Sequence, residues 1–175
     1  MKKKIVIILC SCFSLLSLNV IAQKESKTFS VGFGLEAGVP TGNFSNIYSA
    51  TAGLTIRGSY HVGPGFVTLT TGLIGYAPKT GKGVPKKLGL EIPVRAGYKY
   101  IIQDHFFVMG ELGYASFKSY FSEGGGNVGS TSTGSFIAAP SVGVQWNAFE
   151  VSLRYEAFFR SGAGGDLALR LGFNF

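Results

Sequence analysis

The sequence contains very little cysteine: Cys10 and Cys12 are the only two cysteines among 175 residues, and both lie within the first 22. The rest of the chain therefore has no disulfide framework, no thiol nucleophile and no cysteine-based zinc site. Long apolar runs are also missing after residue 22, where no segment reaches the roughly 18 consecutive apolar residues that mark a membrane helix. If this part of the chain lies in a membrane, it must cross it as strands.

The first 22 residues have the pattern of a secretory signal peptide. Residues 1–4 are basic, residues 5–18 are mostly apolar, and Val20, Ile21 and Ala22 are short enough for signal peptidase. We expect cleavage after Ala22. An uncleaved transmembrane anchor is the alternative, but polar residues interrupt the run, which is shorter than the roughly 20 apolar residues that a spanning helix needs.

Removing 22 of the 175 residues leaves 153, a size that suits one domain. We expect a short periplasmic tail at 23–28 and a single domain at 29–175. Loss of Lys2, Lys3 and Lys4 reduces the sixteen basic residues to thirteen against nine acidic ones, a net charge of +4.

Alternation of apolar residues with small or polar ones dominates this domain. The last ten residues alternate without a break and end on Phe175. A soluble domain seldom ends on such an apolar strand, because an exposed edge of this kind invites aggregation, whereas lipid accommodates it. The same period of two predicts eight strands: Phe29–Val39, Ala50–Val62, Phe66–Ala77, Leu88–Tyr100, Phe106–Phe117, Ser135–Trp146, Phe149–Arg160 and Asp166–Phe175. The facing of 66–77 stays open, and Pro93 indicates a β-bulge in the fourth strand.

The connections between these strands alternate in length. Short turns lie at 63–65, 101–105 and 147–148, and longer loops lie at 40–49, 78–87, 118–134 and 161–165. This alternation is typical of an up-and-down barrel with short periplasmic turns and longer extracellular loops. The predicted fold is therefore all-β, an eight-stranded antiparallel up-and-down transmembrane β-barrel.

Aromatic residues support the same fold. The strand ends next to the short turns carry one aromatic side chain each, as expected for a girdle at a membrane interface: Phe29, Tyr60, Phe66, Tyr100, Phe106, Trp146, Phe149 and Phe175. The alternative is a soluble barrel with its apolar faces turned inward. The interior of an eight-stranded barrel, however, has little room for so many large side chains.

The polar faces of the predicted strands carry six acidic and six basic residues. Charges in a narrow interior are costly unless they are paired, so equal numbers predict a salt-bridged, closed lumen. A narrow channel is the alternative. The predicted lumen network consists of Glu36, Arg57, Glu91, Arg95, Lys99, Glu111, Glu150, Arg154, Glu156, Arg160, Asp166 and Arg170.

Few residues of the sequence indicate a catalytic or ligand-binding function. The histidines that would serve an enzyme, His61 and His105, fall at periplasmic turns, and we predict no catalytic residues, no cofactor and no metal site. The lysines of one long loop are candidates for contact with lipopolysaccharide phosphates or other anions, with a merely solvated loop as the alternative: Lys79, Lys82, Lys86 and Lys87. No aromatic platform accompanies these lysines, so nucleic acid is not expected as a partner.

Four segments resemble a known family: Leu90–Tyr100, Phe107–Tyr114, Val151–Glu156 and Leu171–Phe175. They are similar to the small outer-membrane β-barrel domains of the OmpA/OmpX type, and more closely to PorT-like β-barrel proteins. The resemblance implies a monomer among outer-membrane lipids and lipopolysaccharide. It also implies that Phe173 and Phe175 form an assembly signal for the barrel insertion machinery, although Arg170 stands where that signal has a glycine.

A fold does not determine a function, so three functions stay open. The first is a closed barrel with a structural or surface-interaction role through its loops. The second is a narrow channel or transport protein of the outer membrane. An envelope-lipid-modifying enzyme comes third.

Overall fold

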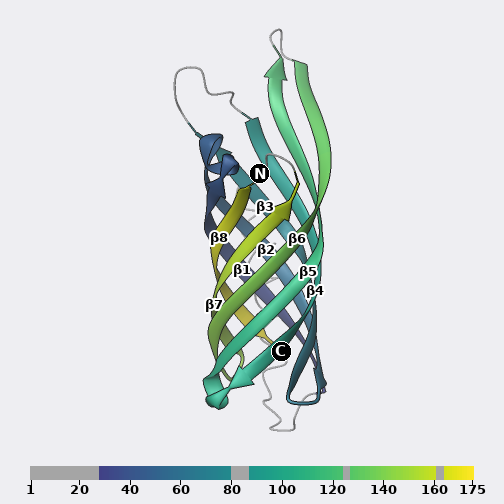
Figure 1. Cartoon of the computed structure of the whole chain (residues 1–175), viewed down its shortest axis with the longest axis vertical. Helices are drawn as coiled ribbons and strands as arrows, with labels where there is room; N and C mark the ends of the chain where they lie inside the picture. The colour runs from purple at the N-terminus through teal and green to yellow at the C-terminus, as the bar shows by residue number, and fades with distance from the viewer. Residues whose placement is uncertain (1–27, 80–86, 124–126, 161–163) are drawn as a thin grey trace, which may run out of the picture.

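The structure is a computed structural model that describes residues 28–79, 87–123, 127–160 and 164–175. Eight antiparallel strands close into a single barrel in which β8 pairs with β1 (Figure 1). The predicted eight-stranded, all-β barrel is confirmed. The strands are β1 (Phe29–Gly42), β2 (Tyr48–Val62), β3 (Gly65–Pro78), β4 (Lys87–Ile102), β5 (Phe106–Glu123), β6 (Asn127–Trp146), β7 (Phe149–Phe159) and β8 (Gly164–Asn174).

Two short 3-10 helices complete the described fold: η1 (Asn43–Asn46) between β1 and β2, and η2 (Gln103–His105) between β4 and β5. In the described part of the chain, no helix has the length and apolar character needed to cross a membrane.

The period of two separates an apolar exterior from a polar interior. On β5, Leu112 is 69% exposed, whereas its neighbour Glu111 is 1% exposed and points inward. Phe136 on β6 is 70% exposed beside the buried Ile137. Large apolar side chains are exposed in this way on all eight strands, and such an exterior is suited to lipid rather than to water.

The facing of β3 is now defined. Val67, Leu69 and Leu73 point outward, whereas Thr70 and Tyr76 are buried. The parity was mixed in the sequence because the inward face of β3 carries the polar Thr70 as well as the apolar Ile74 and the aromatic Tyr76.

Residues 118–134 were predicted to form a loop, and this prediction is wrong for most of them. Strands β5 and β6 remain paired as far as Glu123 and Asn127, and they rise beyond the other strands (Figure 1). We call residues 118–123 and 127–134 the projecting hairpin. Its sequence is rich in Gly, Ser and Thr and lacks apolar alternation, because strands outside the lipid need no apolar face.

Two further predictions at strand ends need correction. The 40–49 connection is shorter than expected, because β1 and β2 extend into it and only η1 with its flanking residue separates them. The bulge predicted at Pro93 is absent: Thr71 pairs with Val94 and Ile74 with Glu91 in one unbroken register. Proline lacks a backbone donor, but it does not change the register here.

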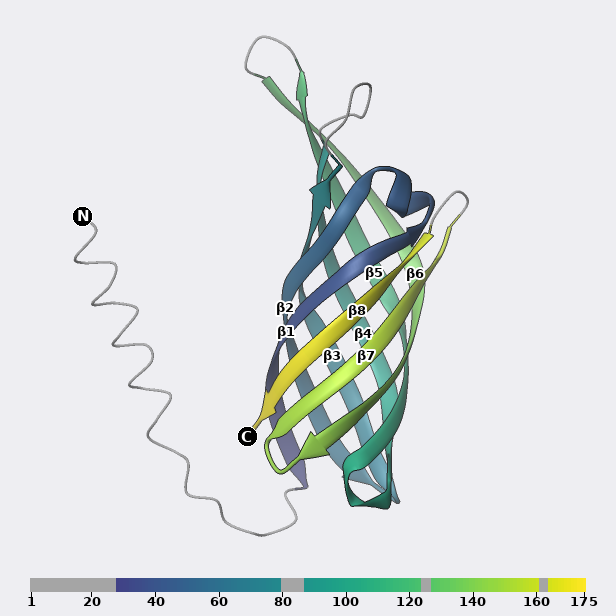
Figure 2. The same cartoon turned by 90° about the vertical axis from the view of Figure 1, so that its left-hand side faces the viewer.

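The two ends of the barrel differ. The short turns lie at the end where β1 begins and β8 finishes, whereas η1 and the projecting hairpin lie at the opposite end (Figure 2). Seven of the eight predicted girdle aromatics are exposed at the short-turn end. The eighth, Phe66, is half-buried and packs edge-on against His61, with their ring centroids 5.1 Å apart.

Candidate functional site: a closed, charged lumen

The barrel interior contains eleven of the twelve charged residues that the sequence placed there. All eleven are buried: Glu36, Arg57, Glu91, Arg95, Lys99, Glu111, Glu150, Arg154, Glu156, Asp166 and Arg170. Arg160 is the exception, because β7 ends at Phe159 and Arg160 is exposed at the rim beyond it. The expected balance of six acids and six bases is therefore wrong, and among the side chains that the structure describes six carboxyl groups and five cationic groups are buried in the interior.

Glu150 forms ion pairs with three cationic side chains in the half of the lumen toward the short turns. Its Oε1 accepts hydrogen bonds of 2.8 Å from Arg57 Nη1 and 2.8 Å from Arg170 Nη1. Its Oε2 accepts one of 2.6 Å from Lys99 Nζ. These partners come from β2, β8 and β4, so one carboxylate on β7 connects strands around the barrel.

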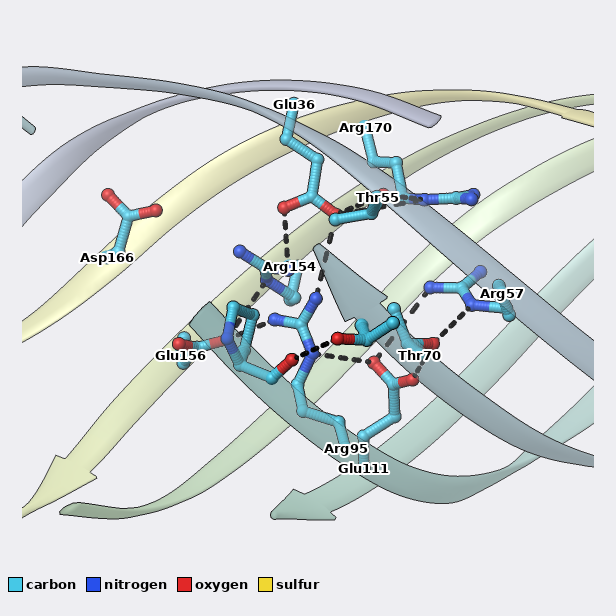
Figure 3. A network of polar contacts seen from close by, with 12 residues as sticks. Glu36, Thr55, Arg57, Thr70, Arg95, Glu111, Arg154, Glu156, Asp166 and Arg170 are labelled. Atoms are coloured by element: carbon cyan, nitrogen blue, oxygen red, sulfur yellow. Dashed lines mark hydrogen bonds and ion pairs between the residues drawn. The ribbon is translucent and has the colours of Figure 1, made fainter. Parts of the chain in front are cut away.

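Arg95 forms a second centre of the network (Figure 3). It lies farther along its strand from the short-turn end than Glu150 does. Its Nη1 donates a hydrogen bond to Glu156 Oε2. Its Nη2 lies 3.7 Å from Glu36 Oε1, and its Nε lies 3.8 Å from Glu111 Oε2. Arg154 Nη1 approaches the other oxygen of Glu36 to 2.7 Å. Charge pairs therefore connect β1, β4, β5 and β7 across the lumen.

Two threonines link the charged centres, and neither is among the lumen residues predicted from the sequence. Thr55 donates to Glu36 Oε1 at 3.1 Å and accepts from Arg170 Nε at 3.2 Å. Thr70 donates to Glu111 Oε1 at 2.6 Å and accepts from Arg57 Nε at 3.0 Å. Thr55 shares the parity of Arg57 on β2, and this shared parity is the signal that could have identified it.

Side chains close the short-turn end of the lumen. Lys99 Nζ lies 4.0 Å from the centroid of the Phe107 ring and 2.5 Å from Gln145 Oε1. The ammonium group is thus held by a carboxylate, an amide and an aromatic face together.

Aromatic rings close the opposite end. We call this group the aromatic lid, and it consists of Phe44, Tyr48, Tyr76, Phe117 and Phe158. The centroid of the Phe44 ring lies between 5.1 and 6.3 Å from those of the other four rings. Phe44 belongs to η1, so a residue of the first long connection covers the mouth of the barrel.

Two buried carboxyl groups make no ion pair with any described residue: Glu91 and Asp166. Glu91 Oε2 accepts a hydrogen bond of 2.6 Å from the Tyr76 hydroxyl, but none of the described residues donates to Oε1. Asp166 accepts from the Thr51 hydroxyl at 3.0 and 3.2 Å. Both lie in the half of the lumen toward the aromatic lid.

The remaining predicted residues are spread over the surface. Lys79 is exposed after β3, Lys82 and Lys86 lie outside the described residues, and Lys87 is described by its backbone alone. Phe173 and Phe175 are exposed at the short-turn end with ring centroids 5.0 Å apart.

The described residues offer little for catalysis. His61 and His105 are exposed at the short-turn end, where their imidazole rings lie against the rings of Phe66 and Trp146. Within the described ranges, no three His, Cys, Asp or Glu residues are grouped so as to hold a metal ion.

A closed antiparallel barrel with an apolar exterior and a packed, charged interior defines the class of small membrane-spanning β-barrels. Solved structures of this fold are similar to most of the chain. The attachment invasion locus protein Ail of Yersinia pestis, in complex with the heparin analogue sucrose octasulfate, has a TM-score of 0.59 and 18% identity over 84% of this chain and 96% of Ail.

Two further barrels give similar values. The N-terminal β-barrel domain of OprF from Pseudomonas aeruginosa has a TM-score of 0.64 and 14% identity, over 83% of this chain and 97% of that one. Neisserial surface protein A has a TM-score of 0.56 and 12% identity, over 85% and 98%. No protein-family model and no curated protein matches the sequence. At these identities the likeness shows the fold.

Proposed function

We propose that the protein is an integral outer-membrane barrel, closed to ions, that serves a structural or surface-interaction role through its long-loop end. The observation that carries the proposal is the cross-lumen charge network, in which Glu150 alone holds three cations from three strands. An eight-stranded barrel is just wide enough for its own side chains to fill, which supports a lumen without a solvated path. The apolar exterior and the signal-peptide pattern support the location, and four segments support a place among PorT-like proteins.

The projecting hairpin supports the surface role. Among the described side chains, three exposed cations lie at this end of the barrel: Lys118 on the hairpin, Arg160 after β7 and Lys79 after β3. A partner for this end is therefore anionic, such as the phosphates of lipopolysaccharide. The polyanion bound to Ail is consistent with this chemistry on a barrel of the same fold.

Conductance across planar bilayers tests the closed state. We expect the refolded protein to give no single-channel current at any voltage or salt concentration at which a wide porin, refolded in parallel, conducts. Heat-modifiable mobility on a gel establishes beforehand that the barrel is folded. Stable unitary currents from the folded protein would contradict a closed lumen and favour the narrow channel.

A further inference from the structure

The projecting hairpin leaves one strand edge unpaired. Strands β5 and β6 pair without a break to the tip of the hairpin, and β4 covers the other side of β5 as far as Phe121. In contrast, β7 pairs with β6 only up to Phe136. Residues 127–135 of β6 therefore have β5 on one side and no described strand on the other, in the part of the sheet that rises beyond the barrel (Figure 1). We call residues 127–135 the free edge.

Pro140 shows which residues of the free edge direct their backbone groups outward. The β5–β6 ladder runs through Pro140 without interruption, whereas the β6–β7 ladder is interrupted at residues 139 and 140. Because proline has no N–H to donate, the nitrogen of Pro140 faces β7. Backbone groups of alternate residues point to the same side of a strand, and the register with β5 is regular from Pro140 to the tip. Ser130, Ser132 and Gly134 therefore direct their N–H and C=O groups away from β5.

The free edge has none of the features by which proteins protect an exposed strand. Such edges usually carry a lysine, a proline or a bulge that prevents another strand from pairing. Residues 127–135 read Asn-Val-Gly-Ser-Thr-Ser-Thr-Gly-Ser, without charge or proline, and their pairing with β5 contains no bulge. The backbone groups of this edge are therefore available to a further strand.

A second copy of the chain in the same membrane does not suit the free edge. Both copies would insert in one orientation, so their β6 strands would run in the same direction. An antiparallel ladder needs opposite directions, and the parallel alternative is less stable per residue. An extended segment of another protein has no such constraint. At about 3.3 Å per residue, the free edge matches an extended segment of roughly eight residues.

Two exposed cations flank the free edge. Arg160 follows directly after Phe159, which forms the last β6–β7 pair with Phe136, so Arg160 lies beside the lower end of the edge. Lys118 is the cross-strand neighbour of Ser132. A strand that pairs with β6 is therefore favoured when it carries carboxylates.

We propose that the free edge binds an extended, acidic segment of another protein, which adds a strand to the sheet beside β6. Main-chain hydrogen bonds to Ser130, Ser132 and Gly134 hold the segment, as in other cases of strand addition. Its carboxylates lie near Arg160 and Lys118. The inference rests on the proposed surface role and gives that role a class of partner.

Hydrogen exchange measured by NMR on the full chain, refolded in octyl glucoside, tests the free edge directly. The probe is an end-capped peptide of alternating valine and threonine with one glutamate at each end. Without peptide, we expect the amides of Ser130, Ser132 and Gly134 to exchange rapidly, and those of Thr131 and Thr133, which face β5, to exchange slowly. Saturating peptide should slow exchange in the first group at least tenfold and leave the second group unchanged.

Ser132→Pro tests the outward N–H, because it removes a donor from the free edge and none from the β5–β6 ladder. We expect it to weaken peptide binding at least tenfold, measured by fluorescence anisotropy. Ser132→Ala is the matched control and should bind as the wild type does. Heat-modifiable mobility on a gel shows that each variant is folded.

A modified peptide covers the case in which Ser132→Pro does not fold. Two versions carry methyl groups on alternate backbone nitrogens, one version for each of the two alternations. We expect one version to bind the wild-type protein at least tenfold more weakly and the other to bind as the unmodified peptide does, because an added strand donates from one side only. Equal binding of both versions would exclude strand addition.

Four results would overturn the inference. They are no saturable binding of the peptide, equal affinity of the wild type and Ser132→Pro, equal binding at low salt when glutamine replaces both glutamates, and protection confined to Thr131 and Thr133. A wild-type dimer that Ser132→Pro abolishes would also overturn it, since the occupant would then be a second copy.

The proposed function is tested separately from this inference. Ser132→Pro keeps Lys118 and Arg160, so it should bind lipopolysaccharide and remain silent in planar bilayers as the wild type does. Failure of peptide binding with both properties intact would contradict the free edge alone. Single-channel currents from a wild-type protein that binds the peptide would contradict the closed barrel alone.

Discussion

Arg57 and Glu150 form a 2.8 Å charge pair between β2 and β7, two strands that are not neighbours in the barrel. Both side chains are 1% exposed, so the pair lies across the lumen and out of contact with solvent. A pair of this kind can cost nearly as much in desolvation as it returns in attraction. Its clear consequence is geometric, because it connects two non-adjacent strands of the barrel across the lumen.

Replacement of Arg154 tests how strongly the barrel depends on its internal charges. Arg154 lies 2.7 Å from Glu36 Oε2 and 3.7 Å from Glu156 Oε2. Arg154→Ala leaves both carboxylates without this buried partner, which we expect to cost on the order of 3–5 kcal/mol of unfolding free energy. The measurement is the urea unfolding midpoint of protein refolded in detergent or lipid.

Arg160→Ala is the matched control, because the same side chain is removed from an exposed position beyond β7. We expect it to change the unfolding free energy by less than about 0.5 kcal/mol. Similar midpoints for the two variants would mean that water screens the lumen charges, which would favour the narrow channel over a closed barrel.

Glu150 and Asp166 should differ although both are buried acids. Glu150→Gln removes the charge that holds Arg57, Lys99 and Arg170, so we expect a loss of several kcal/mol. Asp166→Asn retains a carbonyl oxygen for the Thr51 hydroxyl and disrupts no ion pair with a described residue, so we expect a change of about 1 kcal/mol or less. Urea titrations of the two variants, side by side, make the comparison. A larger loss from Asp166→Asn would contradict the role of Glu150 as the centre of the network.

Binding to lipopolysaccharide tests the cationic long-loop end. Lys118→Gln removes one exposed charge from the projecting hairpin, and we expect it to weaken binding by up to about 1 kcal/mol, an effect that decreases with added salt. Ser132→Ala is the control, because Ser132 is the cross-strand neighbour of Lys118 and carries no charge. Equal binding by wild type, Lys118→Gln and Ser132→Ala at low salt would show that the hairpin does not contact the anion.

The sequence predicted most of the fold because lipid imposes a strict period of two on every spanning strand. Leu112 and Glu111 could be placed on opposite faces without a structure for that reason. The alternation of apolar and polar residues stops where the strands leave the membrane. For this reason the sequence predicted a loop in place of the projecting hairpin, and a lumen position for Arg160. The aromatic lid was missed for another reason. Phe44 lies in a connection without periodicity, and its meeting with Phe158 depends on closure of the barrel.

Deletion of Phe175 should affect assembly more than stability. Its ring is 40% exposed and packs against Phe173 and Phe33, with centroids 5.0 and 6.1 Å away, and its backbone N–H donates a 2.8 Å hydrogen bond to Val31 O. The deletion therefore removes peripheral ring contacts and one hydrogen bond at the end of the β1–β8 pairing. If Phe173 and Phe175 are the signal read by the insertion machinery, the deletion reduces outer-membrane levels in cells, and the undelivered chain is degraded in the periplasm. Refolding of the purified variant in detergent should remain nearly unchanged.

Phe29→Ala is the control for this deletion, because Phe29 is another exposed girdle aromatic at the same end but lies at the start of β1. The pair of assays, membrane level in cells and refolding yield in detergent, is measured on both variants. We expect the control to reach the membrane at wild-type levels. If the variant without Phe175 also reaches the membrane at wild-type levels, Phe175 is not part of an assembly signal. Its ring is then one more girdle aromatic in contact with lipid.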